Sequence, residues 1–133
     1  MEFLSRWREP IYALLRIVVG FLFMCHGVQK LNMIFTGAEL PPMPPPLFYL
    51  TALIESLGGL LVMIGLFAGP AAFICSGTMA VAYFMAHQPQ GLLPLHNKGE
   101  LAAIYSWVFL YIAARGSGIW SVDAARGRSP SVG

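Results

Sequence analysis

Polar residues capable of proton transfer interrupt the first hydrophobic segment of the chain. The stretch FMCHGVQKL, residues 23–31, contains His26 and Lys30, and Arg16 lies in the apolar run before it. Histidine changes charge near neutral pH, and lysine can donate hydrogen bonds to a ligand. Because His26 and Lys30 are four residues apart, they lie side by side on a helix. This spacing predicts a polar site within an apolar environment.

Further titratable residues occur at matching depths in the later apolar segments. Glu55 lies inside the second segment, His87 ends the third and Glu100 begins the fourth. If successive segments alternate in direction, all these side chains reach the same half of the molecule. Histidine, lysine and glutamate together supply hydrogen-bond donors and a proton route. We therefore predict one ligand-binding site formed by His26, Lys30, Glu55, His87 and Glu100.

Glu55 is the residue of this set for which a passive role is hardest to defend. A charged side chain near the centre of a bilayer costs about 2.5–3.5 kcal/mol when it is unpaired. We therefore expect Glu55 to be buried and paired with Lys30 or Arg16. Purely structural roles stay open: Arg16 could extend to lipid head groups, Lys30 could anchor a helix end, and His26 could be a packing residue.

The composition determines the environment of this site. Of the 133 residues, 57% are hydrophobic and only 11% are charged, against roughly 25% charged residues in soluble domains. A soluble domain of this length could not bury so much apolar surface. The composition therefore predicts an integral membrane protein. The net charge of +2, without a basic cluster, argues against a nucleic-acid partner.

The hydrophobic residues fall into separate segments of helical length. Apolar stretches occupy residues 11–31, 47–67, 70–87 and 100–114. A spanning helix needs about 20 residues, so the first two fit, the third is marginal and the fourth is short. The motif FAGP at 67–70 predicts a tight turn, and prolines and a glycine make 87–99 a loop. We predict an all-α, four-transmembrane-helix up-down bundle, a single membrane domain over 1–133 with short cytoplasmic tails.

Small residues predict which helix faces meet. In the first segment, one helical seam contains Arg16, Gly20, Phe23, Gly27 and Lys30. A matching stripe in the second segment contains Glu55, Gly58, Gly59 and Val62. Glycines let two helices approach closely in a membrane. We expect these two faces to pack against each other, which would also shield their charges from lipid.

Two other features are assigned simpler roles. The run PPMPPP at 41–46 should not form a regular helix, and we expect an extended cover over the site, a plain spacer or a docking segment.

Cys25 and Cys75 should differ in depth by roughly 10 Å, too far for a disulfide. We interpret both cysteines as small apolar residues.

The order of these motifs resembles that of a known family. The segments LLRIVVGFLFMCHGVQKL, ESLGGLLVMIGLFAGPAA, HQPQG, GELAAIY and GIWSVD follow one another across residues 12–123. Together they resemble the DoxX family of small bacterial membrane proteins. The matching positions are Arg16, His26, Gly27, Lys30, Glu55, Gly58, Gly59, His87 and Glu100. The resemblance implies a four-helix membrane bundle and a link to quinone-coupled sulfur oxidation or to complexes that handle thiol and oxidative stress.

Two functional hypotheses follow. The chain is either a membrane subunit of a quinone-linked oxidoreductase, not a complete enzyme alone, or a non-catalytic accessory subunit of a larger membrane complex. Its partners would be the lipid bilayer and other membrane subunits or a soluble redox protein. A haem bound by His26 and His87, or a metal bound by these histidines and Glu55, is geometrically conceivable. We expect neither, because no supporting residues for such ligands are evident in the sequence.

Basic residues predict the orientation of the spans. The side that carries both termini would hold Arg6, Arg8, Arg115, Arg126 and Arg128. The opposite side would hold only Lys30 and Lys98. Because cytoplasmic segments are enriched in Lys and Arg, we expect a multi-pass protein of the bacterial inner membrane with both termini in the cytoplasm.

This orientation can be tested with a reporter. An enzyme that is active only outside the cytoplasm, fused after Gly133, should show no activity, whereas one that is active only inside should be active. The reverse pattern would mean that the termini are extracytoplasmic.

Overall fold

The computed structural model of the chain describes residues 1–127. Every regular element among these residues is helical, as predicted for an all-α protein. The final residues 128–133, which include Arg128 of the expected C-terminal tail, lie outside the described residues.

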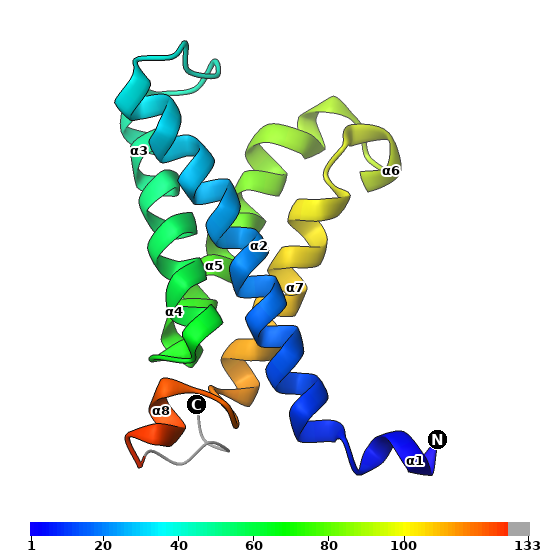
Figure 1. Cartoon of the computed structure of the whole chain (residues 1–133). Helices are drawn as coiled ribbons and strands as arrows, with labels where there is room; N and C mark the ends of the chain where they lie inside the picture. The colour runs from blue at the N-terminus through cyan, green and yellow to red at the C-terminus, as the bar shows by residue number, and fades with distance from the viewer. Residues whose placement is uncertain (128–133) are drawn as a thin grey trace.

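The chain forms a series of long helices connected by short segments (Figure 1). Figure 1 shows the chain ascending along α2, returning along α3 and α4, ascending again along α5 and returning along α7. Two of these helical runs contain a segment of wider π-helical geometry. The elements are α1 (Glu2–Ser5), α2 (Arg8–Thr36), α3 (Pro45–Leu53), η1 (Ile54–Gly58, π), α4 (Gly59–Ile64), α5 (Ala68–Ala82), η2 (Tyr83–His87, π), η3 (Gln88–Gln90, 3₁₀), α6 (Pro94–Asn97), α7 (Glu100–Arg115) and α8 (Val122–Ala125).

The long helices are suited to a lipid environment. Within the described part of the chain, three helical runs are long and apolar enough to cross a membrane: Arg8–Thr36, Pro45–Ile64 and Ala68–Gln90. The structure is therefore that of a membrane protein. Helix α7 has only 16 residues, fewer than the ~20 that a span usually needs, so the fourth span stays a prediction.

The first long helix extends beyond the predicted boundaries. It begins at Arg8 and continues to Thr36, where Gly37 adopts a left-handed conformation with φ 68° and ends it. The apolar residues after position 31 sustain the helix. Lys30 therefore lies about 9 Å before Thr36 at 1.5 Å per residue. The expected position of Lys30 at the end of the first segment, where it could anchor a helix end, is therefore wrong, because the lysine is inside the helix.

The proline-rich segment is partly helical. Pro44 precedes α3, and Pro45 and Pro46 occupy its first turn. The expectation that the whole run stays outside a helix is therefore wrong. The amide hydrogens of the first turn have no partner within a helix, so proline loses nothing there.

The glycine seam of α2 packs against the helical run from α3 to α4, as predicted. A Cβ atom at Gly20 would lie 2.5 Å from the backbone nitrogen of Met63, and one at Gly59 would lie 2.6 Å from that of Met24. A Cβ atom at Gly27 would overlap the backbone of Glu55 and Ser56. Any larger residue would force these helices apart.

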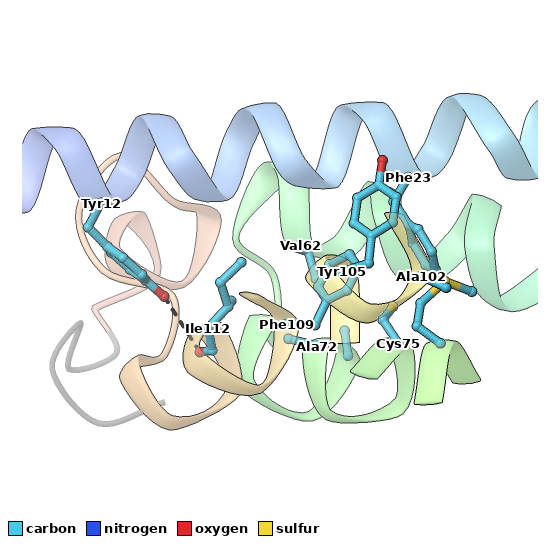
Figure 2. Packing of buried hydrophobic residues seen from close by; sticks show 11 residues of the cluster. Tyr12, Phe23, Val62, Ala72, Cys75, Ala102, Tyr105, Phe109 and Ile112 are labelled. Atoms are coloured by element: carbon cyan, nitrogen blue, oxygen red, sulfur yellow. Dashed lines mark hydrogen bonds between the residues drawn. The ribbon is translucent and has the colours of Figure 1, made fainter. Parts of the chain in front are cut away.

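Aromatic side chains fill the space between α2 and α7. The ring of Phe23 lies 4.7 Å from that of Phe109 and 5.3 Å from that of Tyr105, measured between centroids. Figure 2 shows Tyr105 and Phe109 rising from α7 toward α2, with Cys75 and Ala72 of α5 beneath them. Edge-on aromatic pairs contribute about 0.5–1.5 kcal/mol beyond the area they bury. This core joins α2 to the helix pair α5 and α7.

Arg16 connects three parts of the chain from a fully buried position. Its Nη1 donates to the carbonyl oxygens of Val62 and Met63, at 2.9 and 2.8 Å. Its Nη2 donates to those of Ile119 and Trp120, at 3.2 and 2.8 Å. The first two carbonyls end α4, where the helix dipole favours a cation. Arg16 therefore links the end of α4 to the segment after α7, and it does not extend to lipid head groups.

A buried aspartate, Asp123, stabilises the same end of the molecule as Arg16, which we call the base. Asp123 Oδ2 accepts hydrogen bonds from the backbone nitrogen of Phe67, at 2.9 Å, and from the hydroxyl of Ser117, at 2.7 Å. Phe67 and Trp120 adopt left-handed conformations, with φ 49° and 55°. Such conformations are strained for residues with side chains. The bonds from Asp123 to Phe67 and from Arg16 to Trp120 hold these two turns in place.

Replacing Arg16 tests its role as a structural link. Arg16→Met should lower the free energy of unfolding in detergent by about 3 kcal/mol, because four carbonyls around the buried guanidinium lose a charged donor. Arg16→Lys should recover only part of this loss, since an ammonium group cannot address both carbonyl pairs. The exposed Arg126 provides a control, and Arg126→Gln should stay within about 0.5 kcal/mol of the parent. Equal melting of Arg16→Met and the parent would contradict this role.

Candidate functional site

The candidate site is built on an ion pair between α2 and the π segment η1. Lys30 Nζ lies 2.9 Å from Glu55 Oε1, and the Glu55 side chain is 6% exposed against 26% for Lys30. The predicted burial and pairing of Glu55 are therefore confirmed, with Lys30 as the partner. The alternative pairing of Glu55 with Arg16 is wrong, because the guanidinium of Arg16 donates to the backbone carbonyls of Val62 and Met63 instead.

The surroundings of Lys30 hold its ammonium group in position. Nζ also donates to the hydroxyl of Thr51 at 3.1 Å, and that hydroxyl donates to the carbonyl oxygen of Phe48 at 3.0 Å. The ring of Phe48 lies under Nζ, 5.6 Å from it. Thr51 is one helical turn before Glu55, so both address Lys30 from the same face.

Glu55 occupies a π-helical turn rather than an α-helical one. Short π segments are rare in helices and occur often at functional sites. Gly27 of α2 lies directly against the backbone of Glu55 and Ser56. The two helices are therefore in very close contact where the second one is widened. The result is a carboxylate held between helices at a fixed position.

One oxygen of this carboxylate has no partner among the described residues. Glu55 Oε2 is buried and accepts no hydrogen bond. A buried carboxylate oxygen without a donor is energetically costly. It can be satisfied by a proton or by a ligand that brings its own hydrogen-bond donor.

The other predicted site residues lie in the same half of the molecule but apart from the pair. His26 is exposed, and its ring packs edge-on against Tyr105 with centroids 6.2 Å apart. His87 is half-buried, and its Nδ1 lies 3.2 Å from the carbonyl oxygen of Asn97. Glu100 is exposed at the start of α7. Among the described residues, none of these three is hydrogen-bonded to the ion pair, and their role in binding stays a prediction.

Asn97 organises the loop beside this site and was not identified from the sequence. It is fully buried. Its Nδ2 donates to the carbonyl oxygen of Gly91 at 2.9 Å and to the hydroxyl of Tyr83 at 3.2 Å. Its Oδ1 accepts from the backbone nitrogen of Gly99 at 2.8 Å. The sequence shows Asn97 two residues before Gly99 in a loop, which is a common arrangement in turns. This arrangement predicts a turn but not the burial of the asparagine.

Comparisons with known proteins agree with the helical arrangement. The model of the DoxX family matches residues 11–88, which contain most of α2, the run from α3 to α4, and α5 with most of its extension. An uncharacterized protein of Haemophilus influenzae is 37% identical over 129 residues, which cover 92% of this chain and 96% of the relative. No solved structure matches the chain.

Replacing Glu55 tests the ion pair. Glu55→Ala should lower the free energy of unfolding by about 3–5 kcal/mol, because it leaves the partly buried Lys30 without a counterion. Thermal unfolding in detergent, and the amount of folded protein in the membrane, measure this loss. The double variant Lys30→Met with Glu55→Met should be more stable than either single change, since no unpaired charge remains.

Glu100 provides the matched control for this measurement. It is an exposed carboxylate at the start of α7, and Glu100→Ala should change stability by less than about 0.5 kcal/mol. If Glu55→Ala melts like Glu100→Ala, the pair contributes nothing to stability.

Proposed function

The chain belongs to the DoxX family, and from this premise we propose that it is a membrane subunit of a quinone-linked redox system. Its three long helical runs and the shorter α7 would form a four-helix up-down bundle in the bacterial inner membrane, with both termini in the cytoplasm. The polar site around Lys30 and Glu55 would then lie in the extracytoplasmic half. The clustering of arginines near the termini supports this orientation.

The observation that carries this proposal is the incomplete hydrogen bonding of the Lys30–Glu55 pair. An ammonium group has three hydrogens, and Lys30 directs two donor bonds to Thr51 and Glu55. Glu55 Oε2 is a buried acceptor without a partner in the described structure. The pair thus offers one donor and one acceptor. A quinone carbonyl needs a donor, and a quinol hydroxyl needs an acceptor.

The residues present fit a quinone on chemical grounds. A bound quinone supplies two-electron redox chemistry that no side chain of this site provides. Lys30 would donate to a carbonyl oxygen of the ring and keep the site electropositive. Glu55 would take up or release the proton that accompanies electron transfer. His26, His87 and Glu100 would act at the entrance to the site, since they lie in the same half without contacting the pair.

The exposure of the pair suits a ligand that arrives from the lipid phase. The Lys30 side chain is 26% exposed, whereas that of Glu55 is 6% exposed. The ligand would therefore meet Lys30 first and Glu55 at greater depth. The adjacent Phe48 ring offers an apolar surface for an aromatic ligand.

A second candidate function is that of an accessory subunit packed against a larger membrane complex. It is favoured by α7, which has 16 residues and exposes large apolar residues along its outer face: Leu101, Ile104, Trp107, Leu110 and Tyr111. A helix shorter than the hydrocarbon thickness is accommodated by bilayer thinning or by association with other helices. A partner subunit on α7 would satisfy this requirement.

Quinone content distinguishes the two functions. Protein purified in mild detergent should retain quinone, which is measured by solvent extraction and chromatography. Lys30→Gln and Glu55→Gln should each reduce the quinone content about tenfold or more, as expected for loss of a hydrogen bond to a charged group. His26→Leu should reduce it less, because His26 makes no hydrogen bond to the pair in the described structure.

The matched control is Glu2→Gln, a carboxylate-to-amide change at an exposed position on α1, at the opposite end of the molecule, which should retain parental quinone content. Thermal unfolding of each variant separates loss of ligand from loss of fold. Folded variants at Lys30 and Glu55 with unchanged quinone content would reject the quinone site. Co-purification of a membrane complex that survives these changes would then support the accessory role.

A further inference from the structure

A hollow lies at the base of the molecule, at the opposite end from the Lys30–Glu55 pair. It has a volume of about 420 Å³ and is bordered by α1, the first turns of α2 and the end of α7. Its lining includes Leu4, Arg8, Ile11, Tyr12, Leu15 and Tyr111. Figure 1 shows α1 turning sideways from the base of α2. The hollow is thus formed where the chain enters its first span.

The walls of the hollow are apolar and fixed in position. Tyr12 and Tyr111 pack edge-on with ring centroids 5.8 Å apart. The Tyr12 hydroxyl donates to the carbonyl oxygen of Gly116 at 2.5 Å, and Arg115 lies over the Tyr12 ring at 4.9 Å. Ile11 and Leu15 are 48% and 39% exposed beside these rings. These contacts leave an apolar surface that is open on one side.

The charges around the hollow are predominantly positive. Arg8 lines it, and Arg6 lies at the bend between α1 and α2 beside Trp7, with its guanidinium 5.8 Å from the Trp7 ring. In the described part of the chain neither arginine forms an ion pair, whereas Arg115 is paired with Glu9. Glu2 on α1 is the other nearby carboxylate, and no ion pair to it occurs among residues 1–127. Arg6 and Arg8 therefore remain available to an external anion.

We propose that this hollow binds an anionic phospholipid, with an acyl chain against Ile11, Leu15 and Tyr111 and the phosphate at Arg8 and Arg6. The apolar wall continues into the outward face of α2, where Leu14 and Val18 are 52% exposed, so an acyl chain can pass from the hollow into the bilayer. An exposed Trp7 at the same level is typical of the membrane interface. Juxtamembrane arginines attract anionic lipids. The site does not depend on the proposed redox function.

Lipid binding can be measured directly by native mass spectrometry in detergent. The protein should retain phosphatidylglycerol in preference to phosphatidylcholine when the two are supplied at equal concentration. Arg8→Gln should weaken phosphatidylglycerol binding roughly fivefold, and the change of both Arg6 and Arg8 to Gln roughly 25-fold, from the contribution of each basic residue near an anionic surface. Arg8→Lys should retain most of the binding, because it keeps the charge.

Three controls decide the interpretation. Arg126→Gln changes an exposed arginine directly after α8 and outside the hollow, and it should leave lipid binding unchanged. A loss of binding equal to that of Arg8→Gln would indicate a non-specific effect of surface charge and overturn the site. Glycerol 3-phosphate in excess should not displace the lipid, and displacement would indicate a head-group site without an acyl chain. Equal retention of both lipids by the parent would also overturn the proposal.

Discussion

The close backbone contact between α2 and the run from α3 to α4 positions both polar clusters of this protein. Gly20 and Gly59 meet near one end of the contact, and Gly27 meets the backbone of Ser56 near the other. With the helix axes this close, Arg16 can reach the terminal carbonyls of α4, and Lys30 can reach Glu55. A wider separation would leave both cations without partners in an apolar environment, where an unpaired charge is costly.

The two clusters differ in how fully their polar atoms are used. Arg16 directs four hydrogen bonds to carbonyl oxygens, and it stabilises the end of α4 together with the turn at Trp120. The Lys30–Glu55 pair retains a buried acceptor, Glu55 Oε2. The first cluster therefore has the properties of a structural joint. The second has the properties of a site that a ligand or a proton can complete.

The distribution of these features along the bundle separates structural from interactive regions. The base is held by Arg16, Asp123 and the strained turns at Phe67 and Trp120, so the segment after α7 is part of the fold rather than a free extension. The opposite half contains the π segments η1 and η2, which carry Glu55 and His87. Such widened turns are rare in helices and occur often at functional sites, which agrees with the position of the candidate site.

The sequence alone determined the helical class, the faces that pack and the burial of Glu55 beside a cation, because apolar residues and glycines repeat with helical periodicity and a membrane tolerates few unpaired charges. It left the choice between Lys30 and Arg16 as that cation open. It could not determine the acceptors of Arg16, since backbone carbonyls occur at every residue and only the tertiary arrangement brings Val62 and Trp120 to one guanidinium. It predicted that His26, His87 and Glu100 share one half of the molecule with Lys30 and Glu55, and their role in binding stays a prediction. Whether these three residues contact Lys30 depends on the rotation of the helices, on the π segment and on the length of α2. Only the folded structure determines these three features.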